Sequence, residues 1–194
     1  MPPKQKFARE EVVTAALTLA RREGIEAITA RKLGAELGVS SRPIFTVFRN
    51  MEEVQQETAK AARDIYNAYV EQGLAETPAF KGVGMQYFRF ARNEPKLFEW
   101  LFMSANDNSV TFSDVLPAID EKSDRILDSI QTAYGFSREN AYRLYQVLWI
   151  FTHGLACLHI SGISCLTEDE VSKLLTEVFT GMFIKLKSEK KENV

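Results

Sequence analysis

The sequence is poor in the residue types that most often carry catalysis or bind metals. Its 194 residues include two histidines and two cysteines, Cys157 and Cys165. Two cysteines give no disulfide framework, which fits a reducing compartment. No apolar run reaches the ~18 residues that a membrane helix needs, and the N-terminus lacks the apolar segment of a signal peptide. We therefore expect a cytoplasmic protein without a membrane segment.

Sequence patterns of enzymes are also lacking. There is no GxGxxG or Walker loop, no GxSxG turn and no HExxH pair. The acidic run Glu168-Asp169-Glu170 stands at an expected helix start, where carboxylates interact favourably with the helix dipole. Its position is explained without acid–base chemistry, so we predict neither an enzyme nor a bound cofactor.

The histidines and cysteines are close in sequence, which raises the question of a zinc or copper site. His153 and Cys157 are four residues apart and share a helical face. His159 lies roughly 240° from His153 around the same helix, and Cys165 is expected in a loop. This spacing argues against a four-ligand cage, so we predict no metal site. A two-residue half-site at a dimer axis stays open.

The chain as a whole has no excess of positive charge, with a net charge of −2, but its charge is divided unevenly. Residues 1–50 contain nine Lys and Arg against five Glu, a balance of +4, and the rest contains fifteen against twenty-one, a balance of −6. Positive charge on one segment suits contact with nucleic-acid phosphates. A balance of +4 on 50 residues is by itself within normal scatter.

The same first segment contains the clearest pattern of the chain, a series of short helices. Apolar residues at helical spacing predict a helix over residues 10–23, ended by Gly24: Val12, Val13, Ala16, Leu17 and Ala20. Thr29 is placed to cap a second helix over about residues 30–37.

A tight turn follows this second helix. Gly38 ends the helix, Val39 anchors the turn, and Ser40 is placed to cap a third helix that begins near Ser41. Two helices joined by a glycine-containing turn are typical of a helix-turn-helix, whose second helix enters the major groove of DNA.

Residues 7–54, which include AALTLARREGIEAITARKLGAELGVSSRPIFTVFRNMEEV, resemble the DNA-binding segment of the tetracycline-repressor (TetR) family of bacterial regulators. The chain runs without a gap against that pattern and matches it at Gly24, Thr29, Leu33, Gly38, Val39, Ser40, Ile44, Phe45, Phe48 and Val54. It departs from the pattern at three positions. Phe45 replaces a phosphate-binding tyrosine, Met51 replaces a lysine, and Pro43 stands in the third helix, where a first-turn proline is tolerated.

The resemblance implies which side chains contact DNA. We expect base contacts from the outward side of the third helix, at Ser41, Arg42 and Thr46, with Arg42 suited to a bidentate contact with guanine. Phosphate contacts are expected from Thr29, Ser40 and Arg49, and Phe45 occupies a contact position. Helix caps and solvated surface charges are the alternative roles. An arm over the DNA backbone is a further hypothesis, made of Lys4, Lys6 and Arg9.

Beyond residue 50 the sequence predicts further helices and no strand. Their expected ranges are 51–75, a helix that starts at Thr77-Pro78, another that starts at Glu94-Pro95, and 116–134, 138–160 and 168–187. The last two are apolar on more than one face, and the family pairs its last two helices into a four-helix dimer interface. We therefore predict a homodimer formed through Leu144, Leu148, Phe151, Leu155, Val171, Leu175, Val178, Phe179 and Met182. The core of a monomer is the alternative role for these helices.

The segment LWIFTHGLACLH resembles the Trp…His-Gly (WHG) signature of one C-terminal subgroup of TetR-like regulators. By this resemblance an apolar effector pocket is expected between aromatic walls, with His153 as a hydrogen-bonding group. The residues predicted to form it are Phe88, Phe98, Trp100, Phe102, Met103, Trp149 and His153. Core packing is the alternative for each aromatic residue, and a backbone hydrogen bond in the core or interface is the alternative for His153.

The sequence as a whole predicts an all-α fold with an N-terminal three-helix head and a C-terminal helical bundle. The expected domains are residues 1–54, for DNA binding, and residues 55–194, for effector binding and dimerisation. The predicted function is a regulator, most simply a repressor, that binds a double-stranded DNA operator and is released by a small apolar effector. The alternative is a helical dimer with impaired DNA binding that acts as a ligand-binding or partner-binding protein.

Overall fold

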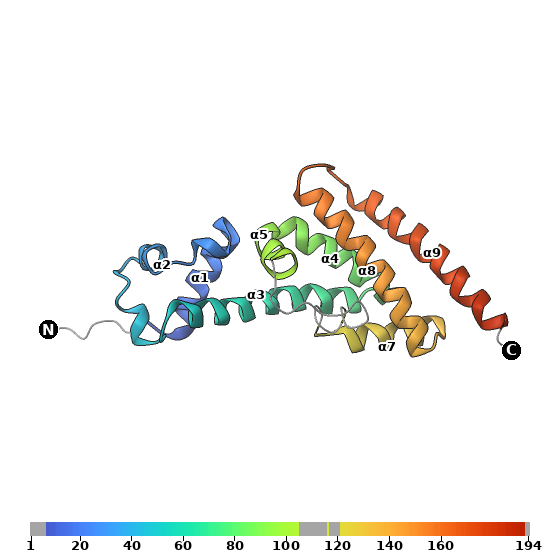
Figure 1. The fold of residues 1–194 in the computed structure, drawn as a ribbon, viewed down its shortest axis with the longest axis horizontal. Helices are drawn as coiled ribbons and strands as arrows, with labels where there is room; N and C mark the ends of the chain where they lie inside the picture. Colours follow the sequence, from blue (N-terminus) through green and yellow to red (C-terminus); the bar gives the residue numbers. More distant parts are fainter. Residues whose placement is uncertain (1–6, 105–115, 117–120, 193–194) are drawn as a thin grey trace. The chain divides into compact units, whose positions relative to one another are not determined.

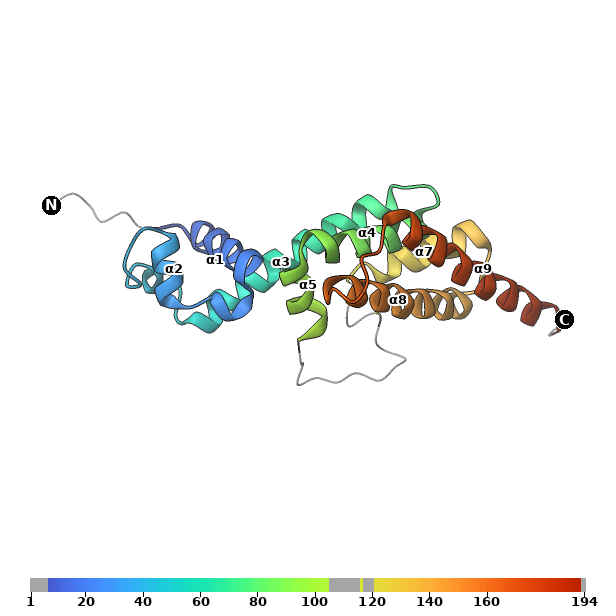
Figure 2. The ribbon, with the colours of Figure 1, turned by 90° about the horizontal axis from the view of Figure 1, so that it is seen from above.

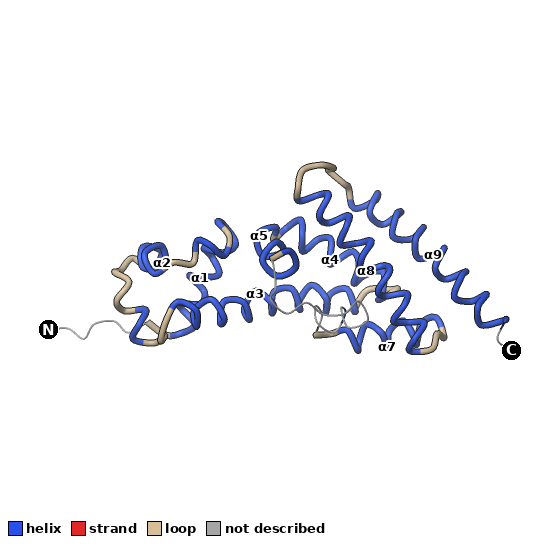
Figure 3. The backbone as a smooth tube through the Cα atoms, viewed as in Figure 1, coloured by secondary structure: helices blue, strands red, loops and turns tan. Residues whose placement is uncertain are grey.

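The computed structural model describes residues 7–104, 116 and 121–192, and the regular elements among them are all helical (Figure 3). This confirms the predicted all-α class. The chain forms two compact units. The head unit consists of residues 1–65 and 94–105, and the body unit consists of residues 66–93 and 106–194.

The head unit begins with the helices that the sequence predicts. Its elements are α1 (Arg9–Glu23), η1 (Ile25–Ala27), α2 (Ala30–Glu36), η2 (Ile44–Thr46), the first part of α3 (Met51–Leu74), α5 (Pro95–Phe98) and the π-helical turn η3 (Glu99–Met103) (Figure 1). Gly24 ends α1 with a φ of 88°, and the Thr29 hydroxyl accepts a hydrogen bond from the Lys32 amide at 3.3 Å. Both predicted helix ends are therefore confirmed. The core of the unit is fully buried and includes Val12, Ala16, Leu19, Leu33, Ile44, Phe48, Val54, Leu97 and Phe98.

The division into units differs from the domain boundary expected at residue 54. Helix α3 continues without interruption from Met51 to Leu74, and its residues up to Ile65 belong to the head. The segment Glu94–Ala105 also belongs to the head, because Leu97 and Phe98 are completely buried and α5 packs on α1. The apolar face of a helix shows that the helix packs on a core, but the sequence does not show which of the two cores it packs on.

The body unit is built around α4 (Ala79–Asn93). Helix α4 packs against α7 (Ser123–Tyr134), α8 (Arg138–Ile160) and α9 (Glu168–Glu192), and Figures 1 and 2 both show α8 and α9 side by side. The sequence predicted α8 at its observed ends. Ser137 caps it through a bond from the Asn140 amide, and Gly135, with φ of 66°, ends α7. Residues 117–120 of the predicted helix 116–134 lie outside the described residues.

Two glycines allow a very close approach of α3 and α4 within the body unit. A Cβ placed on Gly73 would lie 2.6 Å from the Val83 Cα, and a Cβ on Gly82 would lie 2.3 Å from the Gly73 carbonyl oxygen. Backbone on both sides leaves no room for either methyl group. The close approach holds the start of α4, which lines the cavity described below, against the end of α3.

Candidate DNA-binding surface and effector cavity

The backbone of the turn after α2 packs directly against Gly34. This residue is buried, and a Cβ on it would lie 2.9 Å from the Val39 carbonyl oxygen and 3.0 Å from the Ser41 nitrogen. The Val39 amide donates to the Gly34 carbonyl at 2.8 Å, and Gly38 takes a φ of 68°. The sequence pattern identified Gly38 but missed Gly34, because a helical glycine gives no sign of what packs on it.

The third helix of the head is shorter than predicted. Instead of an α-helix from Ser41, the chain forms turns and the 3-10 helix η2, with amide bonds from Thr46 to Pro43 and from Val47 to Ile44. The Thr46 hydroxyl also donates a hydrogen bond to the Pro43 carbonyl oxygen, at 2.6 Å, and so competes with backbone amides for that acceptor. Pro43 has no amide hydrogen to donate, and Ile44, Thr46 and Val47 are β-branched, which weakens helix formation further. The predicted capping role of Ser40 is wrong, since no side chain caps this turn.

An arginine of α1 holds the end of this segment. Arg9 donates to the Val47 carbonyl at 2.8 Å and to Glu53 at 3.0 Å, and its guanidinium lies 4.1 Å from the centre of the Phe48 ring. The Arg49 amide donates to the other Glu53 oxygen at 2.7 Å. These bonds, the Arg49 amide first, lower the pKa of Glu53 to about 2. Arg9 therefore stabilises the packing of α1 against this segment and is not part of a free arm. Lys4 and Lys6 lie outside the described residues.

All the predicted DNA-contact residues reach the surface of the head. Ser41 is half-buried, and the others are exposed: Thr29, Ser40, Arg42, Phe45, Thr46 and Arg49. Phe45 is 45% exposed, whereas Ile44 and Phe48 beside it are buried, so Phe45 presents its ring to solvent. Arg42 makes no ion pair in the described part of the chain, so its guanidinium is available to a ligand. The turn therefore presents hydroxyl groups, an aromatic ring and two arginines on one short segment.

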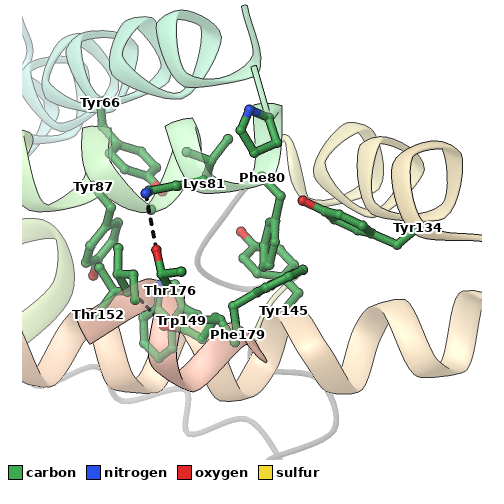
Figure 4. Close-up of a pocket in the computed structure, with 15 residues that line it drawn as sticks. Tyr66, Phe80, Lys81, Tyr87, Tyr134, Tyr145, Trp149, Thr152, Thr176 and Phe179 are labelled. Carbon is green, nitrogen blue, oxygen red and sulfur yellow. Dashed lines mark hydrogen bonds between the residues drawn. The ribbon is translucent and has the colours of Figure 1, made fainter. Parts of the chain in front are cut away.

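The body unit contains a cavity of about 410 Å³ (Figure 4). Its walls come from α3, α4, α7, α8 and α9 and are largely aromatic. The lining residues are Tyr66, Pro78, Phe80, Lys81, Val83, Gly84, Tyr87, Tyr134, Tyr145, Leu148, Trp149, Thr152, Leu175, Thr176 and Phe179. This size and apolar character are typical of small-molecule sites.

Only part of the predicted effector site lies at this cavity. Trp149 lines it. Phe88 is completely buried and its ring packs against His159, at 5.1 Å between centroids. Four other predicted residues belong to the head unit, in α5 and η3: Phe98, Trp100, Phe102 and Met103. The sequence pattern placed them at the pocket because aromatic residues suit an apolar wall, but it missed the tyrosines of α3, α7 and α8.

His153 supports the cavity wall without lining it. Its Nδ1 shares a hydrogen bond with the Tyr87 hydroxyl at 2.9 Å, and its Nε2 lies 3.5 Å from the Cys157 sulfur. The imidazole is stacked on Trp149, with centroids 5.1 Å apart and planes within 16°. Burial lowers the pKa of His153, which favours the neutral ring, and raises the pKa of the Cys157 thiol. His153 thus positions Tyr87 and Trp149, two residues of the wall.

The end of α4 leads into an ion pair of the head. Glu94, which is only 8% exposed, follows Asn93 and precedes α5. Arg21 of α1 binds its carboxylate through two hydrogen bonds, one of them 2.8 Å from Nε to Oε2. Such a two-point contact fixes the orientation of both side chains. The residue that joins α4 to α5 is therefore tied to α1.

Helices α8 and α9 each leave an apolar face open. On α8 this face consists of Val147, Ile150, Phe151, Gly154 and Leu158, of which Ile150 is 43% and Leu158 40% exposed. On α9 it consists of Leu174, Val178 and Met182, all half-buried. Of the residues predicted for the dimer interface, Phe151, Val178 and Met182 lie here.

The remaining predicted interface residues lie away from these open faces. Five of them are buried by their own chain: Leu144, Leu148, Leu155, Val171 and Leu175. Leu148, Leu175 and Phe179 line the cavity. Both stripes of these helices are apolar, so the sequence alone does not distinguish the face that packs on α4 from the open one.

No other kind of site emerges from the described residues. Among them no three His, Cys, Asp or Glu side chains are grouped so that they could hold a metal ion. Nor does the described part of the chain contain a helix long and apolar enough to cross a membrane.

The structure thus combines a helix-turn-helix segment in one unit with an apolar cavity in the other. The family described as "Tetracyclin repressor-like, C-terminal domain" matches residues 80–180, more than half of the sequence. The chain therefore belongs to the tetracycline repressor-like family of transcriptional regulators, which is not a family of enzymes.

Distant relatives agree with this assignment. The chain is 23% identical to an uncharacterised HTH-type transcriptional regulator of Mycobacterium tuberculosis over 93% of its own length and 80% of the relative. It is 24% identical to the class D tetracycline repressor of Escherichia coli over 89% of its length and 71% of the relative. A solved structure of a protein of unknown function from Rhodococcus sp. RHA1 has the same fold, with a TM-score of 0.69 at 19% identity over 96% of this chain and 98% of that one.

Proposed function

We propose that this protein is a homodimeric repressor that binds an operator through its head and leaves it when a small molecule fills the body cavity. The exposed turn at residues 40–49 is the observation that carries the proposal. Arg42 has no ion pair in the described residues, and Ser41 and Thr46 stand beside it. In the major groove an arginine of this kind binds guanine with two hydrogen bonds. Thr29, Ser40 and Arg49 would hold the flanking phosphates.

The route from cavity to head is part of the proposal. Helix α4 supplies five residues of the cavity wall and continues at Asn93 into Glu94, which Arg21 binds. A ligand that displaces α4 therefore pulls on α5 and through Glu94 on α1. Operator affinity falls by the coupling free energy between the two sites, typically ~1–3 kcal/mol.

Dimerisation would give the protein two heads for two half-sites of one operator. The open apolar faces of α8 and α9 support this, because a face with Phe151, Ile150 and Leu158 in contact with water gains stability when a second copy covers it. An isologous dimer reads half-sites spaced by whole turns of DNA, ~34–36 Å each.

Two finer assignments belong to the same proposal. The stacked pair Trp149 and His153, followed by Gly154, supports membership of the WHG subgroup. In this assignment the histidine of the signature has a structural role, because His153 positions the wall of the cavity. Action on DNA places the working protein in the cytoplasm.

The test is a selection of DNA fragments from the source genome on the purified full-length protein, followed by footprinting of those retained. The proposal predicts a palindromic protected site that the Arg42→Ala variant protects less well. Retention of fragments without a common protected sequence, equal for parent and variant, would contradict it and favour the ligand-binding or partner-binding alternative.

A further inference from the structure

We propose that the natural ligand of the body cavity is an amphiphilic carboxylate, with its apolar body among the aromatic side chains and its head group on Lys81. The inference rests on the proposed role of the cavity as an effector site and specifies the chemistry of the effector.

The charge of the cavity lining is the first argument. Of the fifteen lining residues, Lys81 is the one that carries a charge at neutral pH, and no Asp, Glu, Arg or His is among them. A charged head group that enters an apolar site loses hydration and needs an opposite charge at that site to compensate. A negative head group is therefore the charge that this lining can receive.

The position of the Lys81 ammonium group is the second argument. Lys81 is on α4 and its Nζ reaches Thr176 on α9, where the hydroxyl oxygen lies 3.2 Å away (Figure 4). An ammonium group has three N–H donors and a full positive charge. The hydroxyl accepts one of these donors and supplies no opposite charge. Among the described residues Lys81 has no ion pair, so a carboxylate at this point would add charge-assisted hydrogen bonds.

The acidic residues that line a groove together with this lysine are paired with other residues or make no ion pair with it. Lys81 also borders a polar groove that contains Glu76, Glu168 and Asp169. Glu76 is paired with Arg89 at 3.2 Å, and Glu168 is paired with both Arg89, at 2.8 Å, and Arg92, at 2.6 Å. Asp169 shares the groove but makes no ion pair with Lys81. Among the described residues, therefore, no carboxylate competes with a ligand for the ammonium group of Lys81, which is an exposed residue.

The walls determine the rest of the ligand. Phe80, Tyr87, Trp149 and Phe179 surround a space of about 410 Å³, which suits a medium-length alkyl chain or a small aromatic body. Aromatic walls also attract cations through their ring faces. Here Lys81 repels a cationic ligand and no carboxylate of the lining attracts one, so the anion is favoured.

The experiment is calorimetric titration of the full-length protein with three matched probes below their micelle concentrations: decanoate, decanol and decyltrimethylammonium. The parent protein should bind decanoate tightest. Lys81→Met keeps an unbranched side chain one atom shorter, and it should weaken decanoate binding by about ten- to one-hundredfold, as expected for charged hydrogen bonds. Decanol should be affected by less than about threefold, since it gains only apolar contacts there. Lys81→Arg should restore most of the preference, and Lys173→Met, at an exposed lysine of α9 outside the lining, should leave it unchanged.

Tighter binding of decanol or decyltrimethylammonium by the parent would overturn the inference, as would equal binding of decanoate by parent and Lys81→Met, or no binding of any probe. A parallel titration of operator-bound protein separates this inference from the proposed function. Release of DNA by a neutral ligand would refute the role of Lys81 and keep the regulator. Lys81-dependent decanoate binding without any effect on DNA would keep the carboxylate site and refute its regulatory role.

Discussion

Single residues of the head determine whether the turn after α2 can form. Gly34 is buried against the backbone of residues 39–41, which cannot move aside as a flexible side chain would. In Gly34→Ala the new methyl group meets the Val39 carbonyl oxygen at 2.9 Å. We expect a loss of ~1–3 kcal/mol in the free energy of unfolding, measured by urea denaturation, and weaker operator binding. Ala35→Ser, at the exposed neighbouring position, should change stability little; equal effects of the two substitutions would contradict this account.

In the proposed function, Arg42 is the residue on which recognition of the DNA sequence depends most. Arg42→Ala should weaken operator binding by ~1–3 kcal/mol and relax the preference at one base pair, because a bidentate contact with guanine is lost. Competition titrations with operators altered at single positions measure both effects. Lys60→Ala removes an exposed charge on α3 that pairs with Glu57, and it should have neither effect. If Arg42→Ala discriminates between operator variants as well as the parent does, the contact belongs to another residue.

His153 gives the body unit a pH-dependent stability. Burial lowers its pKa in the folded protein, so the unfolded chain takes up a proton first as the pH falls below the usual value near 6.5. The stabilisation is present above that pH and is lost as the pH falls toward the folded pKa. Between pH 7.5 and pH 5.5 the parent should lose more stability in thermal unfolding than His153→Gln, which does not titrate. An equal loss in both proteins would show that the ring is protonated equally well in the folded state.

At the scale of elements, much of the fold could be predicted from the sequence. Helix ends marked by a cap or a glycine were predicted correctly, as at Gly24 and Thr29, because those signals act within a few residues of the chain. The failures concern elements decided by competition or by distant contacts. The turn η2 is too rich in β-branched residues around Pro43 to form an α-helix, and α5 packs with the head, which only the burial of Leu97 and Phe98 reveals.

For the candidate sites too, prediction from the sequence depended on whether the residues are neighbours in the chain. The candidate DNA-contact residues could be named because most of them are close together in sequence. The structure leaves them at the surface, and their contact with DNA stays a prediction. The cavity draws residues from five helices, with Tyr66 from α3 and Tyr134 from α7, and no local pattern links residues so far apart. Lys81 was missed for the same reason, since on its own helix it is an ordinary exposed lysine.

The connection between α4 and α5 leads to a prediction about how ligand binding in the body cavity alters DNA binding by the head. Arg21→Met removes the partner of Glu94, so ligand binding should displace α4 without moving α1. We expect operator binding without ligand to remain, and the loosening of the operator by a bound ligand to shrink from ~1–3 kcal/mol toward zero. DNA titrations at zero and saturating ligand measure this coupling.

Arg22→Met is the matched control for that experiment. Arg22 neighbours Arg21 on α1 but pairs with Glu23 and Glu36 inside the head. Its loss should leave the coupling intact. Full coupling in the Arg21→Met variant would show that the signal passes to the head along another path, such as the continuous helix α3.

At the scale of the whole molecule, the open faces of α8 and α9 predict the oligomeric state. Phe151→Glu places a charge at the centre of the apolar face of α8 and should convert a dimer to a monomer, because a buried unpaired carboxylate is costly. Sedimentation equilibrium measures the change. Ile184→Glu is the control, since Ile184 is 63% exposed and lies outside this face of α9. A monomeric parent, or a Phe151→Glu variant that dimerises as strongly, would refute the interface.

The central claim is that the head binds DNA through its exposed turn, and its most direct test is the affinity for mixed genomic DNA as a function of salt, followed by fluorescence anisotropy. The account predicts a steep linear fall of log affinity with log salt, with a slope of about −0.9 for each phosphate contact, and a slope smaller by about one contact in Arg49→Ala. A flat salt dependence, or no binding even at low salt, would contradict the account and leave a helical protein that binds small molecules or partners instead of DNA.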